Sequence, residues 1–143
     1  MPRRRSPFQR QAGGSVDGFA AILSSDWAAL LAATHIGGSG NELVEGIAVD
    51  RLGNVYVGGE TDSTTLPGQT TSTFQGATDV WVAKFSSPLQ QSPTLEYLGG
   101  ERRDAQRSLW IDAKGNLIST GWTDFVAFFD GTGDVYVARV VMP

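Results

Sequence analysis

Cysteine is absent from this 143-residue chain, and His35 is its single histidine. Without cysteine the protein has neither disulfide bonds nor thiolate metal sites. Long hydrophobic runs are also missing, because the nearest one, Trp27–Ala33, falls far short of the roughly 18 apolar residues that a membrane span needs. These absences predict no membrane span and leave any histidine-dependent catalysis to one residue.

Basic residues are outnumbered, with 11 Lys and Arg against 15 Asp and Glu and a net charge of −4. Nucleic-acid binding needs a basic surface, so this balance disfavours such a partner. Three arginines gather at Arg3–Arg5, but the apolar stretch of a signal peptide does not follow them. We predict a disordered basic tail over residues 1–15, with a basic membrane or nucleic-acid arm as the alternative, and a folded segment over residues 16–143.

Glycine is abundant, with 18 residues, and predicts many turns because glycine adopts positive φ without strain. Alignment of the chain with itself places Asp17–Asp62 on Asp79–Asp124 without a gap. Most of the identical residues are turn formers. The clearest set is Asp50, Gly53 and Asn54, which return as Asp112, Gly115 and Asn116.

The apolar positions of this repeat change conservatively, as where Phe19 is replaced by Trp81. A third copy begins where Asp79–Phe85 returns as Asp134–Val140. Retained turns with varying core residues are typical of one supersecondary unit used repeatedly. The repeat predicts units at residues 17–78 and 79–133 and the start of a third at residues 134–143.

Each unit is predicted to form four short strands. An Asp that opens a type I turn, with Gly at the left-handed position, predicts the hairpins Gly46–Gly59 and Ser108–Gly121. The segment Ser25–Thr34 is ambiguous, because its Ala and Leu residues favour a helix. The repeat register favours a strand there, and we follow the register while allowing a helical turn at Asp26–Leu30.

The segment Gly46–Thr61, which starts Gly-Ile-Ala-Val-Asp, resembles the hairpin of the SBBP repeat, a bacterial β-propeller repeat. Asp79–Phe85 resembles the Asp-Ala-Phe-Val-Ala-Lys-Leu strand of that family, and Leu98–Gly100 resembles part of its Tyr-Leu-Gly-Gly strand. The resemblance covers nearly everything from Asp17 to Val140. It weakens at the second hairpin, which reads Ser-Leu-Trp-Ile-Asp at Ser108–Asp112.

This resemblance implies an all-β fold of four-stranded antiparallel propeller blades, with the Gly-Ile-Ala-Val-Asp strand innermost. About nine strands in two to three blades are then expected. The expected parts are two outer strands (Gly18–Leu23 and Ala32–Ile36), a complete blade (Glu45–Leu98) and three inner strands of the next (Arg107–Val141). Because propellers usually close with about four to eight blades, we expect an incomplete ring. The chain would be a fragment of a longer protein, an open array, or a subunit that self-associates.

No catalytic constellation is recognised in the sequence. His35 aligns with Tyr97 in the repeat, which indicates a structural place on an outer strand. Asp50 and Asp112 are explained as residues that cap their turns. The alternative is a catalytic pair, because a glycosidase uses two carboxyls about 5–10 Å apart. A calcium site at loop carboxylates stays open, but no Asp-x-Asp-x-Asp loop occurs, and Gly37–Gly40 lacks the Lys of a phosphate loop. We expect no catalytic, cofactor-binding or metal-binding residue.

Tryptophan offers the one candidate ligand contact. Trp81 aligns with Phe19 and Tyr136, which predicts a core position. Trp122 follows Gly121 near a predicted strand end, so we expect it to be the most exposed of the four tryptophans and a possible contact for a ligand such as a sugar.

The expected function is a non-catalytic propeller-repeat module with a structural role or an interaction role, binding protein or glycan. Its further partners would be more blades of a longer chain or a second copy. The resemblance, and nothing else, implies a secreted or cell-surface bacterial protein. The alternative is a carbohydrate-active hydrolase or lyase built on a propeller.

Overall fold

Strands and connecting loops make up the described part of the protein. The structure is a computed structural model that describes residues 7–124 and 134–142, and no helix occurs in these ranges. The strands are β1 (Gly18–Leu23), β2 (Leu30–Ile36), β3 (Glu42–Val49), β4 (Val55–Thr61), β5 (Asp79–Phe85), β6 (Thr94–Leu98), β7 (Asp104–Ile111), β8 (Leu117–Thr123) and β9 (Asp134–Val140). The predicted all-β class and the nine strands are confirmed.

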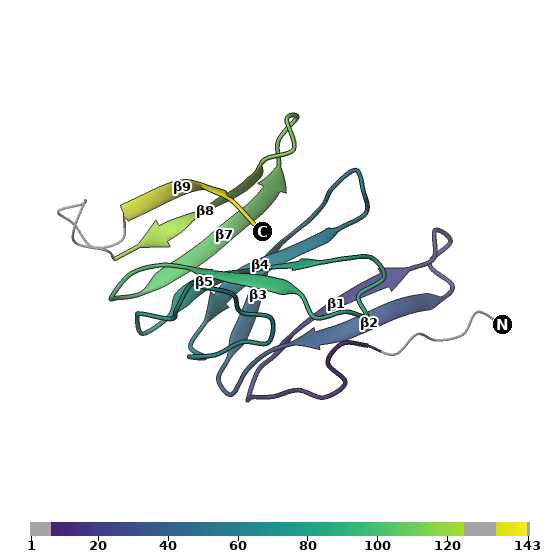
Figure 1. The fold of residues 1–143 in the computed structure, drawn as a ribbon, viewed down its shortest axis with the longest axis horizontal. Helices are drawn as coiled ribbons and strands as arrows, with labels where there is room; N and C mark the ends of the chain where they lie inside the picture. The colour runs from purple at the N-terminus through teal and green to yellow at the C-terminus, as the bar shows by residue number, and fades with distance from the viewer. Residues whose placement is uncertain (1–6, 125–133, 143) are drawn as a thin grey trace.

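The nine strands form three antiparallel sheets that follow one another in chain order (Figure 1). The first sheet is β1–β2, the central sheet is β3–β4–β5–β6, and the third sheet is β7–β8–β9. Three strands begin slightly earlier than predicted: β2 at Leu30, β3 at Glu42 and β7 at Asp104. The additional residues lie at sheet ends, where sequence patterns define boundaries least well.

The two repeat units have the same backbone pairing. An irregularity between Val44 and Gly46 in β3 recurs at the aligned position of β7, between Gln106 and Ser108. The isolated bridge Val16–Asn41 likewise recurs as Thr78–Arg103. The repeat read from the sequence is therefore a repeat of structure.

The ambiguous segment Ser25–Thr34 follows the repeat register and not its helix propensity. The N–H of Trp27 donates to the Ser24 carbonyl at 2.9 Å, and the N–H of Leu89 donates to the Ser86 carbonyl at 3.0 Å. Trp27 has φ of 60° and Leu89 has φ of 66°. The two turns occupy aligned positions and share this hydrogen bond, although the Ser87–Pro88 bond of the second is cis. No helical turn forms at Asp26–Leu30, because pairing with β1 fixes the strand that follows.

The predicted tail contacts the first sheet from Phe8 onward. Phe8 packs on the apolar cluster beneath it, and the N–H of Gln9 donates to Thr34 Oγ1 at 2.9 Å. Asp17 accepts from the N–H groups of Gly13 and Gly14, as Asp79 accepts from Gln75 and Gly76. The repeat thus extends back to Gly13, inside the segment predicted as a tail, and residues 1–6 lie outside the described residues.

Two apolar clusters hold the sheets together, one on each face of the central sheet. The first interface joins the first and central sheets: Ala20 and Ile36 pack in one cluster with Trp81 and Phe85. The second interface joins the central and third sheets, where Val80 and Val82 pack with Leu109. Because side chains alternate along a strand, β5 contributes to both interfaces and is almost wholly buried.

The repeat supplies a matched pair of substitutions to test this packing. Trp81→Ala should lower the free energy of unfolding by about 3–5 kcal/mol, because it opens a cavity at the first interface. Phe19→Ala, at the equivalent but exposed position of β1, should change it by no more than about 0.5 kcal/mol. Urea denaturation followed by circular dichroism measures both, and equal losses would contradict the assigned interface.

Candidate functional site

Two equivalent turns carry the residues singled out in the sequence. In the β3–β4 turn, Asp50 Oδ1 accepts from the N–H groups of Leu52 and Asn54, both at 2.9 Å, and Oδ2 accepts from Asn54 Nδ2 at 2.7 Å. Gly53 has φ of 83°, a value that favours glycine. The predicted turn chemistry is present in full.

The β7–β8 turn repeats this arrangement almost atom for atom. Asp112 Oδ1 accepts from Lys114 at 2.9 Å and from Asn116 at 2.8 Å, and Oδ2 accepts from Asn116 Nδ2 at 2.8 Å. Gly115 has φ of 85°. The two carboxylates act as acceptors within their own turns.

These hydrogen bonds determine the acidity of both groups. The Asn116 side chain and backbone lower the pKa of Asp112 below its usual range, because they stabilise the charged form. Partial desolvation opposes ionisation of Asp50, but the bonds from Asn54 and Leu52 outweigh it and lower the pKa of that carboxyl also. A general acid needs a raised pKa, so neither group is suited to that role.

A groove of about 410 Å³ separates the two turns. Its lining consists of both turn segments and the strand ends beside them: Val49, Asp50, Arg51, Leu52, Ile111, Asp112, Ala113, Lys114 and Gly115. Arg51 and Lys114 bring positive charge to this groove, whereas its two carboxylates are already hydrogen-bonded. The groove therefore combines charged side chains with apolar ones, among them Val49, Leu52 and Ile111.

The residues at the register irregularities of β3 and β7 contact each other between the central and third sheets. Glu45 and Arg107, at equivalent positions of the two units, form an ion pair with 3.6 Å between Oε1 and Nη1. Arg107, an unusual residue for this repeat, therefore has a partner in the adjacent sheet. Both side chains are substantially exposed, so the pair contributes little to stability, about 0–1 kcal/mol.

Trp122 is not the most exposed tryptophan, so that expectation is wrong. It is half-buried on β8, and the Arg103 guanidinium lies 5.6 Å from its ring centroid. Trp27 and Trp110 are more exposed, whereas Trp81 is fully buried and donates through Nε1 to the Glu60 carbonyl at 3.2 Å. The core position of Trp81 is confirmed, and a ligand contact at Trp122 stays a prediction.

His35 occupies a place on β2 opposite Phe19, and its backbone N–H donates to the Gln9 carbonyl at 3.1 Å. Within the described ranges, 7–124 and 134–142, no group of three or more His, Asp or Glu side chains lies close enough to hold a metal ion. No helix in those ranges has the length and apolar character to cross a membrane.

Sequence reasoning missed a pair of buried acids at the sheet interfaces. Glu42 Oε2 accepts from the Gly38 N–H at 2.8 Å, and Asp104 Oδ2 accepts from the Gly100 N–H at 2.9 Å. The repeat alignment places Glu42 on Asp104, which was the available signal. Burial, together with the nearby Asp104 charge, raises the pKa of Asp79.

Comparison with known families agrees with this architecture. Residues 26–67, which include β2, β3 and β4, match the family model of SBBP, the β-propeller repeat. The matched family is the one that the sequence of Gly46–Thr61 resembles. No curated protein matches the chain.

The acidity of the paired turns can be tested by carboxyl NMR titration. We expect Asp50 and Asp112 to titrate below the usual pKa of 3.8, and Asn116→Ala to raise the pKa of Asp112 alone. Asn54→Ala is the matched control and should raise only Asp50. Because folding lowers the pKa of both carboxyls, the charged groups stabilise the folded protein above about pH 3.8. This stabilisation is lost as the pH falls through their folded-state pKa values. Ordinary pKa values in the wild type would contradict the hydrogen-bonded turns.

Proposed function

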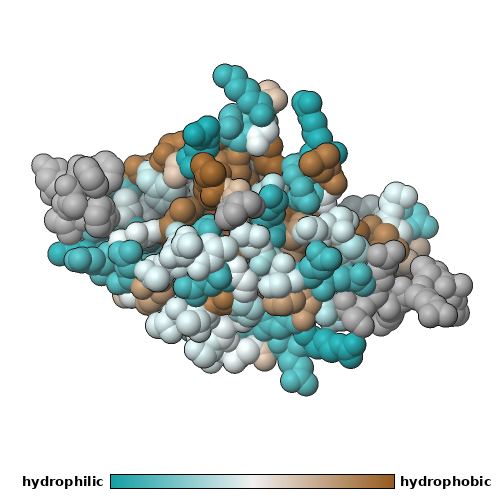
Figure 2. Space-filling model, in the orientation of Figure 1, coloured by the Kyte–Doolittle hydropathy of each residue, from teal (hydrophilic) through white to brown (hydrophobic). Residues whose placement is uncertain are grey.

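We propose that this chain is a non-catalytic β-propeller module that acts as a scaffold by packing against further propeller blades. The observation that supports this is the exposure of apolar residues at both ends of the three-sheet array. Figure 2 shows hydrophobic side chains exposed in several patches among polar ones. The repeat allows each exposed residue to be compared with its equivalent in the central sheet.

The free face of the first sheet matches a face that is buried in the central sheet. Its residues Phe19, Leu23 and Trp27 are 70%, 42% and 80% exposed. Their equivalents in the next repeat unit, Trp81, Phe85 and Leu89, are almost completely buried at the first interface. The first sheet therefore presents the surface that a preceding blade would cover.

The free face of the third sheet gives the complementary result. Val135 and Val137 on β9 are 76% and 73% exposed. Their equivalents on β5, Val80 and Val82, are fully buried at the second interface. An exposed apolar sheet face of this kind favours association, and the covering partner we propose is a following blade.

The inner strand β3 independently supports a preceding blade. Ile47 and Val49 are exposed, whereas their equivalents Leu109 and Ile111 pack against the central sheet. In the central sheet the inner strands β3 and β4 pack against β7 of the next sheet. Among the described residues the first sheet contains only β1 and β2, so no equivalent strands pack against β3. Two further inner strands would complete it as a four-stranded blade.

The groove between the Asp50 and Asp112 turns is a second place for a protein or glycan partner under this proposal. A secreted or cell-surface location is also proposed, and the resemblance to the bacterial family supports it. No arrangement among the described residues favours the alternative of a carbohydrate-active enzyme, because the paired carboxylates serve their own turns.

The complementary end faces make a specific association test possible. Phe19→Ser/Trp27→Ser removes one face, and Val135→Ser/Val137→Ser removes the other. Each double variant alone should be monomeric, but an equimolar mixture should form a one-to-one dimer, because each partner retains the face that the other lost. Size-exclusion chromatography with light scattering measures the masses.

Leu52→Ser is the control, since Leu52 is exposed at a turn away from both end faces. It should leave the association of the wild-type chain unchanged. A monomeric wild-type chain at high concentration, or a mixture of the two double variants that stays monomeric, would contradict the proposal.

A further inference from the structure

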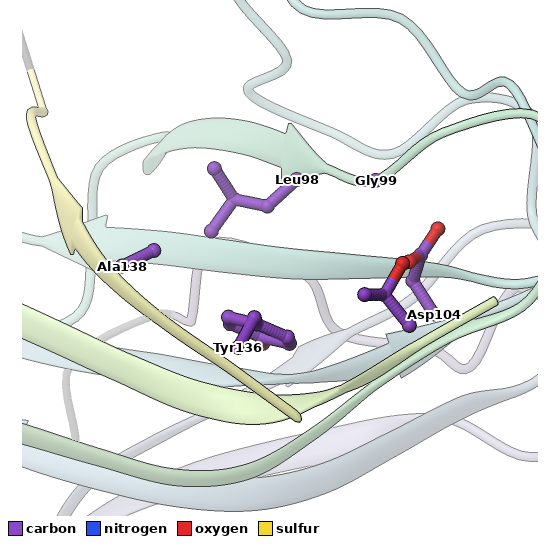
Figure 3. A pocket seen from close by; sticks show the side chains of 6 residues that line it. Leu98, Gly99, Asp104, Tyr136 and Ala138 are labelled. Carbon is purple, nitrogen blue, oxygen red and sulfur yellow. The ribbon is translucent and has the colours of Figure 1, made fainter. Parts of the chain in front are cut away.

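A pocket of about 190 Å³ lies between the central and third sheets, at the second interface. Residues from four strands and the loop between two of them line it: Leu98, Gly99, Asp104, Thr123, Tyr136 and Ala138. Figure 3 shows Leu98 and Tyr136 on facing strands, with Asp104 at one end of the pocket and Ala138 at the other.

Six aligned residues lie at the first interface, and there they are buried. The repeat aligns the pocket residues, in the order given above, with Ile36, Gly37, Glu42, Thr61, Trp81 and Ala83. All six of these are buried. At the second interface Leu98, Tyr136 and Ala138 are only partly buried and Gly99 is exposed.

Two substitutions between the units contribute to the difference, and so does the missing counterpart of β6, since Leu95 and Tyr97 pack in the Trp81 cluster and the described third sheet ends at β9. Tyr136 stands where the first interface has the larger indole of Trp81, and Asp104 stands where it has the longer side chain of Glu42. Glu42 fills its interface and accepts through Oε1 from Thr61 at 2.6 Å and from Ser63 at 2.5 Å. Replacement by smaller side chains in a packed interface leaves a void because the surroundings relax only partly.

The chemistry of the pocket selects for an aromatic ring that carries a hydrogen-bond donor. Leu98, Tyr136 and Ala138 supply an apolar wall, and an apolar cavity of about 150 Å³ is large enough to bind benzene. Asp104 is a buried carboxylate whose Oδ2 accepts from the Gly100 N–H, and a carboxylate offers about four acceptor sites. The structure therefore offers an acceptor at one end of an aromatic-sized space.

We propose that this pocket is a binding site for a small planar aromatic compound bearing an N–H donor, with its ring between Leu98 and Tyr136 and its donor on the Asp104 carboxylate. The indole of Trp81 fills the corresponding place at the first interface, so indole is the natural probe. This inference is independent of the proposed docking at the end faces.

The test is titration of the full chain with indole, followed by amide NMR. Indole should shift the amides of Gly99, Asp104 and Ala138. Tyr136→Trp should fill the space and weaken binding at least tenfold, and it should raise the unfolding midpoint because it restores the packing of the first interface. Tyr136→Phe is the matched control, since it keeps the space open and should retain binding.

Benzofuran, which has the shape of indole without the N–H, tests the role of Asp104. It should bind about tenfold more weakly, because it leaves the carboxylate without its donor. Equal affinity for the two compounds would overturn the assigned anchor. The site itself would be overturned if indole shifted none of these amides up to its solubility limit, or if Tyr136→Trp bound indole as well as the wild type.

Discussion

Burial of both faces of a β-sheet is the constraint on which this structure depends. Along β5, Trp81 and Phe85 point to one neighbouring sheet, and Val80 and Val82 point to the other. Such a strand has no solvent side, so removing either neighbouring sheet would expose buried apolar surface to water. The central sheet meets this requirement within the chain. The first and third sheets meet it on one face each, and their other faces remain apolar and exposed.

The two interfaces share a frame but differ in what fills them. Buried acids hold the adjoining loops in both, through Glu42 at Gly38 and Asp104 at Gly100. Within that common frame, Tyr136 stands where the first interface has the buried Trp81, and a pocket of about 190 Å³ lies beside it. The hydrogen-bonded turns are the same in both units, so the units differ in the side chains at their interfaces and in the number of strands beside them.

The sequence predicted most of the fold because turn chemistry is local. Asp50, Gly53 and Asn54 determine their turn within one short segment, so the second copy at Asp112 could be recognised directly. Contacts between residues distant in sequence were harder to predict. The equivalence of Gly13–Asp17 with Gln75–Asp79 rests on backbone N–H groups, which leave little trace in residue identity. The exposure of Trp122 was misjudged because Arg103, on another segment, lies over its ring.

Unequal burial along the chain is the central claim, and amide hydrogen exchange of the dilute monomer tests it most directly. Amides of β4 and β5 should exchange slowest, through global unfolding, because their sheet is covered on both faces. Amides of β1, β2 and β9 should exchange at least tenfold faster. Uniform protection across the three sheets would contradict the account, since it would mean that the end sheets need no further neighbours.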